Sequence, residues 1–526
     1  MTSAIDLKPS HLDIVERILA EHVPGLEVRA FGSRASWTAR DYSDIDLAVV
    51  GDGPLQWRTL SRLREAFEES RLPMRVDVLD WHAISEGFRE TIKSDCVVVQ
   101  EPAASADWRE VAIGEIADIV GGGTPSTRIP ENFGGDIPWL TPKDLSGIHD
   151  RYVERGERNL SQHGLDSSSA RLLPAGSVLL STRAPIGYVA IAKNPIATNQ
   201  GFRSLVVRDE AVPEYLYYWL KLNTEELERH ASGSTFRELS GSSLKEIRLR
   251  LPPLEEQRAI ARVLGALDDK IELNRRMSET LEEMARALFR SWFVDFDPVR
   301  AKAEGRPSGL PPDLDALFPD SFVASELGKI PKGWEVRSLD EIATFTNGLA
   351  LQRFPPERDE WLPVIKIAEM KRGYSDRTGR ASASIDQRYI VEDGDLLFSW
   401  SGSLELALWT HGRGALNQHL FKVTSDEFPR WFYLGWTREH LDEFRTIAAG
   451  KATTMGHIQR HHLTDARVAA PPANTAVAAD KYIAGLMEQE VRHAVESRSI
   501  TEQRDTLLPR LVSGEVRLGV LAPEEP

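Results

Sequence analysis

The stretch LLPAGSVLLSTRAPIGYVAIAKNPIATNQGFRSL, residues 172–205, decides the architecture because a second stretch follows the same pattern. IVEDGDLLFSWSGSLELALWTHGRGALNQHLFKV, residues 390–423, keeps the apolar runs and the Asn-Gln pair in the same order. The offset between the copies is 218 residues from Asn199 to Asn417, which is far too long for a solenoid repeat. The sequence therefore predicts two homologous domains, with pseudo-two-fold geometry and a target in two parts.

Length and composition bound the class of protein. The chain has 526 residues, of which 41% are hydrophobic and 27% charged, an ordinary globular composition. About three or four domains of roughly 150 residues each are expected. The single cysteine, Cys96, excludes an internal disulfide framework and suits a reducing cytoplasm. The start of the chain lacks the apolar core of a signal peptide, and no apolar run is long enough for a membrane span. We therefore expect a cytoplasmic protein with no membrane partner.

The net charge of −16 bears on possible partners. Proteins that bind nucleic acid normally show a basic footprint. An acidic chain can still carry a local basic face, but the balance argues against tight DNA binding by this chain unaided.

Each copy opens with short β-type runs that Gly and Pro residues separate. Examples are SVLLS and YVAIA in the first copy, and LLFSW and LALWT in the second. We expect each copy to form a mixed, mainly β domain of about 150 residues.

Long helices are expected after these domains, because residues 254–294 contain neither Pro nor a β-rich run. Residues on this segment recur at alternating intervals of four and three, which is typical of a coiled-coil seam. They are Ile260, Leu264, Leu267, Ile271, Asn274, Ser278, Leu281, Ala285 and Leu288. Asn274 is a polar residue in this seam, where it lowers stability but fixes register and partner. The matching helix is expected from about 473 to 508, just before Pro509, with an apolar stripe of Ile483, Met487, Val491 and Ala494. We expect the two helices to pack antiparallel as a spacer.

The N-terminal segment stands outside the repeat. A helix over 11–21 and a strand over 28–31 are expected before Gly32-Ser33, and a strand over 45–50 follows Asp44-Ile45-Asp46. Residues two apart on a strand face the same side, so Asp44 and Asp46 point together. A later strand, MRVDVLD, supplies Asp77.

Three carboxylates on adjacent strands suit hard divalent cations such as Mg²⁺ beside a triphosphate. Two such metals would activate the attacking oxygen and stabilise the leaving pyrophosphate. Gly32 lets the backbone approach a phosphate closely, and Ser33 can donate a hydrogen bond to it. The alternative is that Asp44 and Asp46 merely cap a solvated edge strand.

About residues 10–100, with this Gly-Ser, Asp-x-Asp and third Asp, resemble the minimal nucleotidyltransferase family of the polymerase-beta superfamily. The resemblance implies that Asp44 and Asp46 are metal ligands, that Asp77 is the third ligand or the catalytic base, and that Gly32 and Ser33 bind nucleotide. It also implies Mg²⁺ and a nucleoside triphosphate, with ATP expected, as cofactors. Family members transfer a nucleoside monophosphate, often AMP, to a protein or small molecule. Three questions stay open: whether the site turns over, which molecule is the acceptor, and whether the site is a remnant without activity.

The repeated region carries a second resemblance, on WREVAIGEIADIVGGGTP, ATNQGF, LPPLEEQRAIARVLGALDDKIELN, FRSWFVDFDPV, GWEVRSLDEIA and RDTLLPRLVSGEV. Over about residues 105–515 these motifs resemble the specificity subunit of Type I restriction-modification systems. The second copy departs at Pro471-Pro472, which ANTAVAADKY follows in place of the usual acidic run.

The resemblance implies that each β domain reads one half of a bipartite site on double-stranded DNA. The helices would fix the gap and dock methyltransferase (modification) subunits. Those partners and the restriction/translocase subunits would carry the chemistry of phage defence, and the specificity region would not be catalytic by itself. Half-sites about one turn, roughly 34 Å, apart suit such a spacer. Partners can also contribute phosphate contacts, which relieves the difficulty of the acidic net charge.

The fold expected is α+β multidomain, with a small α/β nucleotidyltransferase domain followed by two mainly β target-recognition domains separated by long antiparallel coiled-coil helices. Expected boundaries are 1–104 (nucleotidyltransferase-like), 105–253 (recognition domain 1), 254–296 (spacer helix 1), 297–330 (linker), 331–472 (recognition domain 2), 473–515 (spacer helix 2) and 516–526 (tail).

Base readers are expected in turn-rich segments, where Arg and Lys usually read guanine. Candidates for DNA binding are Arg128, Lys143, Arg183, Arg203, Arg237, Lys366, Arg413, Lys451 and Arg460, each of which also fits a solvated surface charge. Two domains that read different sequences would share scaffold rather than readers, so the recurring Asn-Gln pairs are interpreted as structural. His457, His461 and His462 suggest a loop near DNA rather than a metal site, because two of them are adjacent and no cysteine accompanies them.

Two other functions stay open. The chain could be a nucleotidyltransferase, transferring AMP to a protein in an antitoxin-like role, whose duplicated region recruits its acceptor. It could also be an orphan DNA binder without partner subunits.

Overall fold

The N-terminal sheet contains four strands in the order β3-β2-β1-β4. Its strands are β1 Glu27–Phe31, β2 Ile45–Val50, β3 Val76–Asp80 and β4 Cys96–Gln100, and its helices are α1 Pro9–His22, α2 Trp57–Glu68 and α3 Glu86–Ser94, with short turns η1 Gly32–Arg34 and η2 Trp81–Ala83. β2 runs parallel to β3 and antiparallel to β1. The predicted helix and three predicted strands are therefore confirmed, with ends that differ by a few residues.

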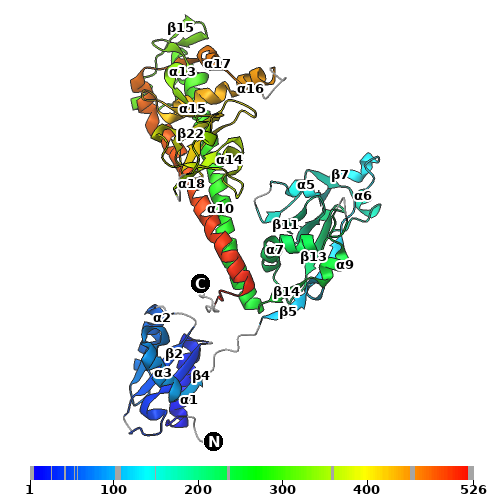
Figure 1. Ribbon diagram of the computed structural model, residues 1–526, viewed down its shortest axis with the longest axis vertical. Coiled ribbons are helices and arrows are strands. Elements are labelled where there is room, and N and C mark those ends of the chain that lie inside the picture. Colours follow the sequence, from blue (N-terminus) through cyan, green and yellow to red (C-terminus); the bar gives the residue numbers. More distant parts are fainter. Residues whose placement is uncertain are drawn as a thin grey trace. The chain divides into compact units, whose positions relative to one another are not determined.

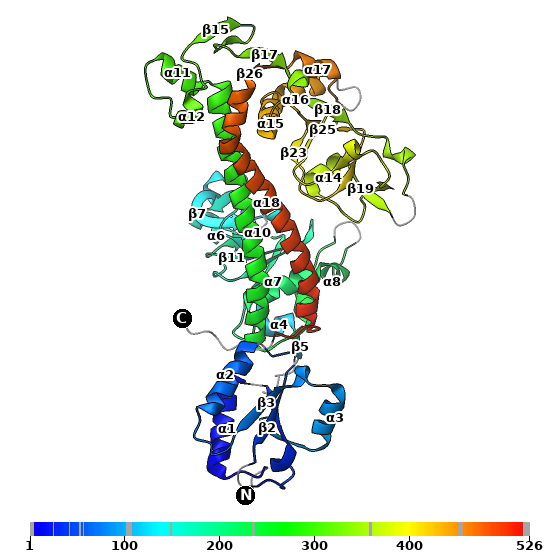
Figure 2. The same ribbon diagram turned by 90° about the vertical axis from the view of Figure 1, so that its left-hand side faces the viewer.

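Alternation along β2 distributes its side chains to two faces. Ile45, Leu47 and Val49 are buried with residues of α1 and α2, whereas Ala48 packs with Ile92 of α3. This is the period of two that a strand between two apolar layers requires. Figure 2 shows these strands between α1 and α3.

The computed structural model describes residues 5–24, 26–40, 43–51, 54–55, 57–100, 108–147, 150–233, 237–356, 360–450 and 456–518. The chain divides into two units, Met1–Leu264 with Leu508–Pro526, and Gly265–Leu507, and Figure 1 shows its elements coloured along the sequence.

The first repeated domain contains a five-stranded sheet, β6-β13-β10-β11-β8, a three-stranded sheet, β12-β7-β9, and the pair β14-β5. The strands are β5 Arg109–Ala112, β6 Ala117–Gly121, β7 Phe133–Leu140, β8 Tyr152–Val153, β9 Arg158–Leu160, β10 Val178–Thr182, β11 Ile186–Ala192, β12 Ala197–Thr198, β13 Phe202–Val207 and β14 Arg248–Leu251. The helices are α4 Ile113–Ile116, α5 Pro142–Leu145, α6 Gln162–Asp166, α7 Pro213–Leu222, α8 Thr224–Arg229 and α9 Gly241–Glu246, with the turn η3 Pro130–Asn132.

The second repeated domain reproduces this plan. Its sheets have the orders β18-β25-β22-β23 and β20-β19-β24-β21, and β17 pairs with β26. The strands are β17 Glu335–Ser338, β18 Thr344–Asn347, β19 Trp361–Ile365, β20 Arg380–Ser382, β21 Ile390–Val391, β22 Leu396–Ser399, β23 Leu406–Leu408, β24 Gly414–Leu416, β25 Leu420–Thr424 and β26 Arg467–Ala470. The helices are α13 Leu339–Ile342, α14 Ile367–Arg372, α15 Arg430–Glu439, α16 Leu441–Ala449 and α17 Arg460–Asp465, with turns η5 Leu351–Arg353 and η6 Gln387–Tyr389. The order β6-β13-β10-β11 thus recurs as β18-β25-β22-β23, which confirms the duplication.

Between the copies lie α11 Asp297–Ala303, α12 Pro312–Asp315 and the hairpin of β15 Phe322–Ser325 and β16 Gly328–Pro331. The long helices are α10 Leu254–Phe289, which a π-helical turn at Arg290–Val294 follows, and α18 Ala473–Ser513.

Inside the second unit α10 and α18 lie side by side and antiparallel (Figure 1). Asp268 pairs with Arg504 at 2.8 Å, and farther along α10 the Asn274 amide donates to Glu496 at 2.9 Å. Asn274 is fully buried, and its partner seam residues are buried or half-buried. The antiparallel spacer and the polar seam residue are confirmed.

The prediction that the second helix stops before Pro509 is wrong. α18 continues through Pro509 to Ser513. A proline removes one backbone donor and crowds the preceding turn, but only one helical turn remains beyond it. Burial of Leu511 and Val512 offsets that cost.

Aromatic residues join the second recognition domain to α10. Phe289 and Phe293 contact Trp431 and Phe432 of α15, with ring centroids 5.0–6.3 Å apart. Gly435 allows this approach, because a Cβ there would lie 2.6 Å from the Phe289 ring.

Among the described residues no helix is long and apolar enough to cross a membrane.

Candidate nucleotidyl-transfer and DNA-recognition sites

The predicted carboxylates gather at one end of β2 and β3. The parallel register places Asp46 opposite Asp77, and Asp44 stands two residues before Asp46. Partial burial raises the pKa of Asp46, and the negative charges of Asp77 and then Asp44 raise it further. Asp77 and Asp44 are therefore close enough to repel the Asp46 carboxylate, and a cation would relieve that repulsion.

Gly32 lies against this cluster. Phe31, at the end of β1, pairs with Asp46, and the chain then turns with Gly32 at φ 75°. A Cβ at residue 32 would lie 2.6 Å from Asp46 Oδ2. Glycine is thus required both by the left-handed backbone and by the space. Half-buried Ser33 follows in the same turn.

Arg34 holds the loop that leads to the carboxylates, a role that the sequence reasoning missed. Its guanidinium donates to the Ser43 carbonyl at 2.9 and 2.7 Å, and to the Asp6 carbonyl at 2.8 Å. The side chain is buried, so the charge-assisted bonds replace its lost solvation. The sequence signal that could have revealed this role is an arginine directly after Gly32-Ser33.

The carboxylates are a suitable donor set for a hard cation. Asp77 pairs with Arg75 at 3.0 Å. Over the ranges that the structure describes, no three His, Cys, Asp or Glu side chains are already grouped as a metal-binding set.

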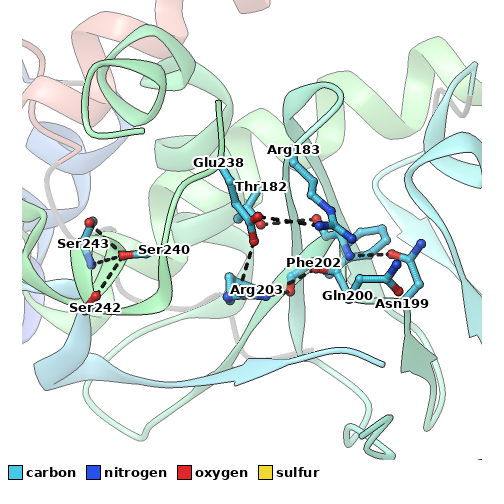
Figure 3. A network of polar contacts seen from close by, with 11 residues as sticks. Thr182, Arg183, Asn199, Gln200, Phe202, Arg203, Glu238, Ser240, Ser242 and Ser243 are labelled. Atoms are coloured by element: carbon cyan, nitrogen blue, oxygen red, sulfur yellow. Dashed lines mark hydrogen bonds and ion pairs between the residues drawn. The ribbon is translucent and has the colours of Figure 1, made fainter. Parts of the chain in front are cut away.

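In the first recognition domain the structure brings Arg183 and Arg203 together through Glu238 (Figure 3). The ion pairs measure 3.6 and 3.2 Å respectively. Arg203 also donates to the carbonyls of Gln200 and Phe202 at 3.4 and 3.0 Å. These residues come from three segments that are distant in sequence.

The Asn-Gln pairs support turns. Asn199 Oδ1 accepts from the Gly201 amide at 2.8 Å, and Asn417 Oδ1 accepts from the His419 amide at 3.4 Å. Gln200 bonds Thr124. The contacts agree with the structural interpretation of these pairs.

Other predicted DNA-binding residues are exposed or make contacts of their own. Arg128 and Lys366 are exposed, Lys143 pairs with Glu157 at 3.4 Å, Arg237 donates to the Glu228 carbonyl, Arg413 lies 4.0 Å from Glu392, and Arg460 donates to the Phe345 carbonyl at 3.4 Å. Lys451 lies outside the described residues. In the segment of the three histidines, His462 Nδ1 accepts from the Gln459 amide at 2.9 Å as a helix cap.

Two comparisons with protein families match separate parts of the chain. Residues 105–283 match the Type I restriction modification DNA specificity domain, and residues 15–102 match the family Polymerase beta, Nucleotidyltransferase.

Relatives cover both parts as well. The chain is 35% identical over 424 residues to the Type I restriction enzyme MjaIX specificity subunit of Methanocaldococcus jannaschii, covering 78% of this chain and 94% of that one. It is 24% identical over 468 residues to the HindI specificity subunit of Haemophilus influenzae, covering 78% and 100%. Its N-terminal part is 50% identical over 97 residues to the probable protein adenylyltransferase MntA of Haemophilus influenzae, covering 18% of this chain and 85% of that one.

A crystal structure of a Type I restriction-modification S subunit from M. genitalium aligns with a TM-score of 0.49 at 16% identity, covering 78% of this chain and 98% of that one. Sequence identity over nearly the whole length of a relative carries the assignment: the chain belongs to the family of Type I restriction enzyme specificity subunits, with a polymerase-beta-type nucleotidyltransferase domain at its N-terminus.

Proposed function

We propose that this chain is the DNA-recognition subunit of a Type I restriction-modification complex in the cytoplasm. Each repeated domain reads one half of a bipartite site on double-stranded DNA. α10 and α18 set the gap and dock the methyltransferase and restriction/translocase subunits. The observation that supports this most is one sheet order used twice, β6-β13-β10-β11 and β18-β25-β22-β23, which suits a target in two parts.

The domain division proposed with this function follows the boundaries expected from the sequence, 1–104, 105–253, 254–296, 297–330, 331–472, 473–515 and 516–526. Its spacer supplies two long surfaces, since α10 has 36 residues and α18 has 41. At about 1.5 Å per residue, 36 residues extend about 54 Å. Helices of that length suit the docking of large partner subunits.

A base-resolution methylome tests the recognition function. The chain, with and without residues 1–104, is co-expressed with a Type I methyltransferase subunit. We expect one bipartite methyladenine motif in both cases, because the recognition domains lie outside the deleted part. Methylation without a two-part motif would contradict the proposal.

We propose in addition that the N-terminal domain transfers a nucleoside monophosphate, with ATP as the expected donor. Asp44, Asp46 and Asp77 would hold Mg²⁺, which stabilises charge on the triphosphate and its leaving pyrophosphate. Gly32 leaves room for a phosphate beside the backbone, and Ser33 donates a hydrogen bond to it. Asp77 is either the third ligand or the base that accepts the proton of the attacking hydroxyl. The strand register that places Asp46 opposite Asp77, with Asp44 two residues before Asp46, supports this second activity.

Transfer of label from α-labelled ATP onto proteins co-expressed with the chain tests this activity. Asp44→Asn and Asp46→Asn are expected to abolish transfer, whereas Asp13→Asn, which changes an exposed carboxylate on α1, keeps it. Absence of transfer from every nucleoside triphosphate in folded wild-type protein with Mg²⁺ would overturn the activity. Label on a toxin-like partner together with an absent methylation motif would favour an antitoxin-like enzyme over the recognition function.

A further inference from the structure

Three segments of the first recognition domain meet beside the end of β10. We call this place the corner and define it by residues 182–184, 199–203 and 237–240 (Figure 3). Backbone bonds hold it together. The Thr182 amide donates to the Gly201 carbonyl at 2.8 Å, and the Leu239 amide donates to the Thr182 carbonyl at 3.0 Å.

The second recognition domain repeats the corner at residues 400–402, 417–421 and 457–458. The Trp400 amide donates to the His419 carbonyl at 3.3 Å, and the Ile458 amide donates to the Trp400 carbonyl at 3.0 Å. These are the same two bonds, because residues 172–205 and 390–423 align without a gap at an offset of 218. The third segment is aligned by the shared bond, which matches Leu239 with Ile458.

A serine supports each corner in the same way. Ser181 Oγ accepts from the Tyr188 amide and donates to the Pro185 carbonyl, both at 2.9 Å. Ser399 Oγ accepts from the Glu405 amide and donates to the Ser403 carbonyl, both at 2.7 Å. The backbone of the two corners is therefore one scaffold used twice.

Left-handed backbone follows in both copies. Ala184 has φ 48° and its counterpart Gly402 has φ 69°. A non-glycine residue there costs free energy and persists only where the surroundings impose the conformation. The scaffold thus fixes the backbone next to Arg183 and so defines the direction of its side chain.

Three side chains on this shared scaffold differ in chemistry between the copies, whereas the Asn-Gln pair recurs in both. The first corner carries Arg183, Arg203 and Glu238. Their counterparts in the second corner are Ser401, Phe421 and His457.

Rings occupy the second corner. Trp400 lies 5.7 Å from His419, 6.4 Å from His457 and 6.1 Å from Phe421 between ring centroids. A duplicated pair of domains that reads two different half-sites must conserve the scaffold and vary the readers. The corner meets both conditions.

We propose that Arg183 reads a guanine in one half of the bipartite site, and that Glu238 positions its guanidinium. The proposal rests on the recognition function proposed above. Arginine bonds the O6 and N7 acceptors of guanine in the major groove with two donors. In the described part of the chain Arg183 has Glu238 as its sole polar side-chain partner, at 3.6 Å, and its side chain is 38% exposed. Most of its five donors therefore face no protein acceptor.

Arg203 has a different role in the same cluster. Its side chain is 24% exposed and bonds Glu238 and two carbonyls of the turn. It is a positioning residue that holds the 199–203 turn and Glu238. Three of its five donors are already used by the protein.

Glu238 also distinguishes a base from a phosphate as the target. A carboxylate within 3.6 Å of the arginine repels a phosphate placed there, whereas it tolerates the uncharged edge of a guanine. A carboxylate can also accept from the amino group of cytosine, the partner base of guanine. Because Glu238 neutralises the charge of Arg183, the pair favours contact with a base over non-specific attraction to the DNA phosphate backbone.

The test is a methylome of the full chain co-expressed with its methyltransferase subunit, for wild type, Arg183→Ala, Arg183→Lys, Glu238→Gln and Arg208→Ala. Arg208 is a matched control, because it is an exposed arginine paired with Asp118 elsewhere in the same domain. We expect Arg183→Ala to lose preference for guanine at one position of one half-site by about tenfold to a hundredfold. The other half-site and the gap stay unchanged, which shows that the protein is folded.

The remaining variants narrow the assignment. Arg183→Lys keeps the charge but loses the two-donor geometry, so it should retain only part of the preference. Glu238→Gln should relax the same position, and Arg208→Ala should leave the motif intact. A wild-type motif that persists in Arg183→Ala, even with weaker methylation at every site, would show a phosphate contact or no contact and overturn the inference. Absence of any bipartite motif in wild type would overturn the recognition function itself, and this inference with it.

Discussion

Glu256 and Arg517, 261 positions apart, form a two-point ion pair at 2.8 and 3.0 Å. Trp108 Nε1 donates to the same carboxylate at 2.9 Å, and the Trp108 ring lies 5.7 Å from the Arg517 guanidinium. The start of the first recognition domain, the first turn of α10 and the segment after α18 are therefore joined at one buried carboxylate.

Loss of this pair should destabilise the first unit. The Glu256 side chain is 6% exposed and that of Arg517 is 35% exposed. Arg517→Ala is expected to lower the free energy of unfolding by about 2 kcal/mol, since bonds to a charged group contribute roughly 1.5–3 kcal/mol and partial exposure weakens them. Urea unfolding and hydrogen exchange in β5 and β14 measure the effect.

Arg510→Ala is the matched control, because Arg510 and Glu515 form an exposed pair near the same end of α18. An exposed pair is worth about 0–1 kcal/mol. Equal losses of unfolding free energy from Arg517→Ala and Arg510→Ala would show that burial of Glu256 does not strengthen its pair with Arg517.

The seam residue Asn274 should lower the stability of the second unit. It is fully buried, and among the described atoms its Oδ1 accepts no hydrogen bond. Asn274→Leu is expected to raise the free energy of unfolding of the second unit by about 1 kcal/mol, because an unsatisfied buried polar atom costs roughly 1–3 kcal/mol. Thermal unfolding checks the direction.

Register should survive the same substitution. Asp268 and Arg504 still join α10 to α18 in the variant, so the gap of the methylated motif should keep its length. Ser278→Ala, in the same seam, is the control. A motif with mixed gap lengths would mean that Asn274 alone sets the register.

Periodic features of this chain were predictable from the sequence. The four-three spacing around Asn274 and the alternation around Asp46 each arise from residues within one element. The duplicated scaffold was predictable for a related reason, since its apolar runs recur in order. Pro509 was misjudged because the burial of Leu511 beyond it depends on tertiary packing.

Contacts between distant segments were not predictable. Neither the pairing of Glu256 with Arg517 nor that of Arg183 with Glu238 leaves a local pattern, because each partner is an ordinary surface-type residue in its own segment. The list of candidate DNA-binding residues therefore contained Arg183 without a reason to prefer it over the others.

Glu490 should make the second unit sensitive to pH. Burial, and then repulsion from Glu282, raise its pKa from 4.5 to about 7, while Arg438 opposes the rise. It lines a pocket of about 220 Å³ where α10, α15 and α18 meet, and Arg286 and Glu439 also line it.

The direction of this pH effect on stability follows from the raised pKa of Glu490. Below pH 4.5 the carboxyl is protonated in both states and has no effect. Between 4.5 and 7 the unfolded state releases its proton first, so stability falls as pH rises, by on the order of 3 kcal/mol once pH exceeds 7. Unfolding midpoints from pH 5 to 8 should fall for wild type and much less for Glu490→Gln. Glu488→Gln, an exposed change on the same helix, should behave as wild type does.

Gly32 offers the sharpest separation of the two proposed activities. Gly32→Ala places a methyl group 2.6 Å from Asp46 Oδ2 on a backbone with φ 75°, so it must displace the carboxylate and strain the turn. Nucleotidyl transfer should fall more than a hundredfold, while the free energy of unfolding of the N-terminal domain falls by about 1 kcal/mol. Gly87→Ala is its control, because a Cβ there meets nothing within 4 Å, and transfer should persist. The methylation motif should be the same in both variants. A Gly32→Ala protein that loses the motif together with nucleotidyl transfer would show instead that the carboxylate end of the N-terminal domain takes part in DNA recognition.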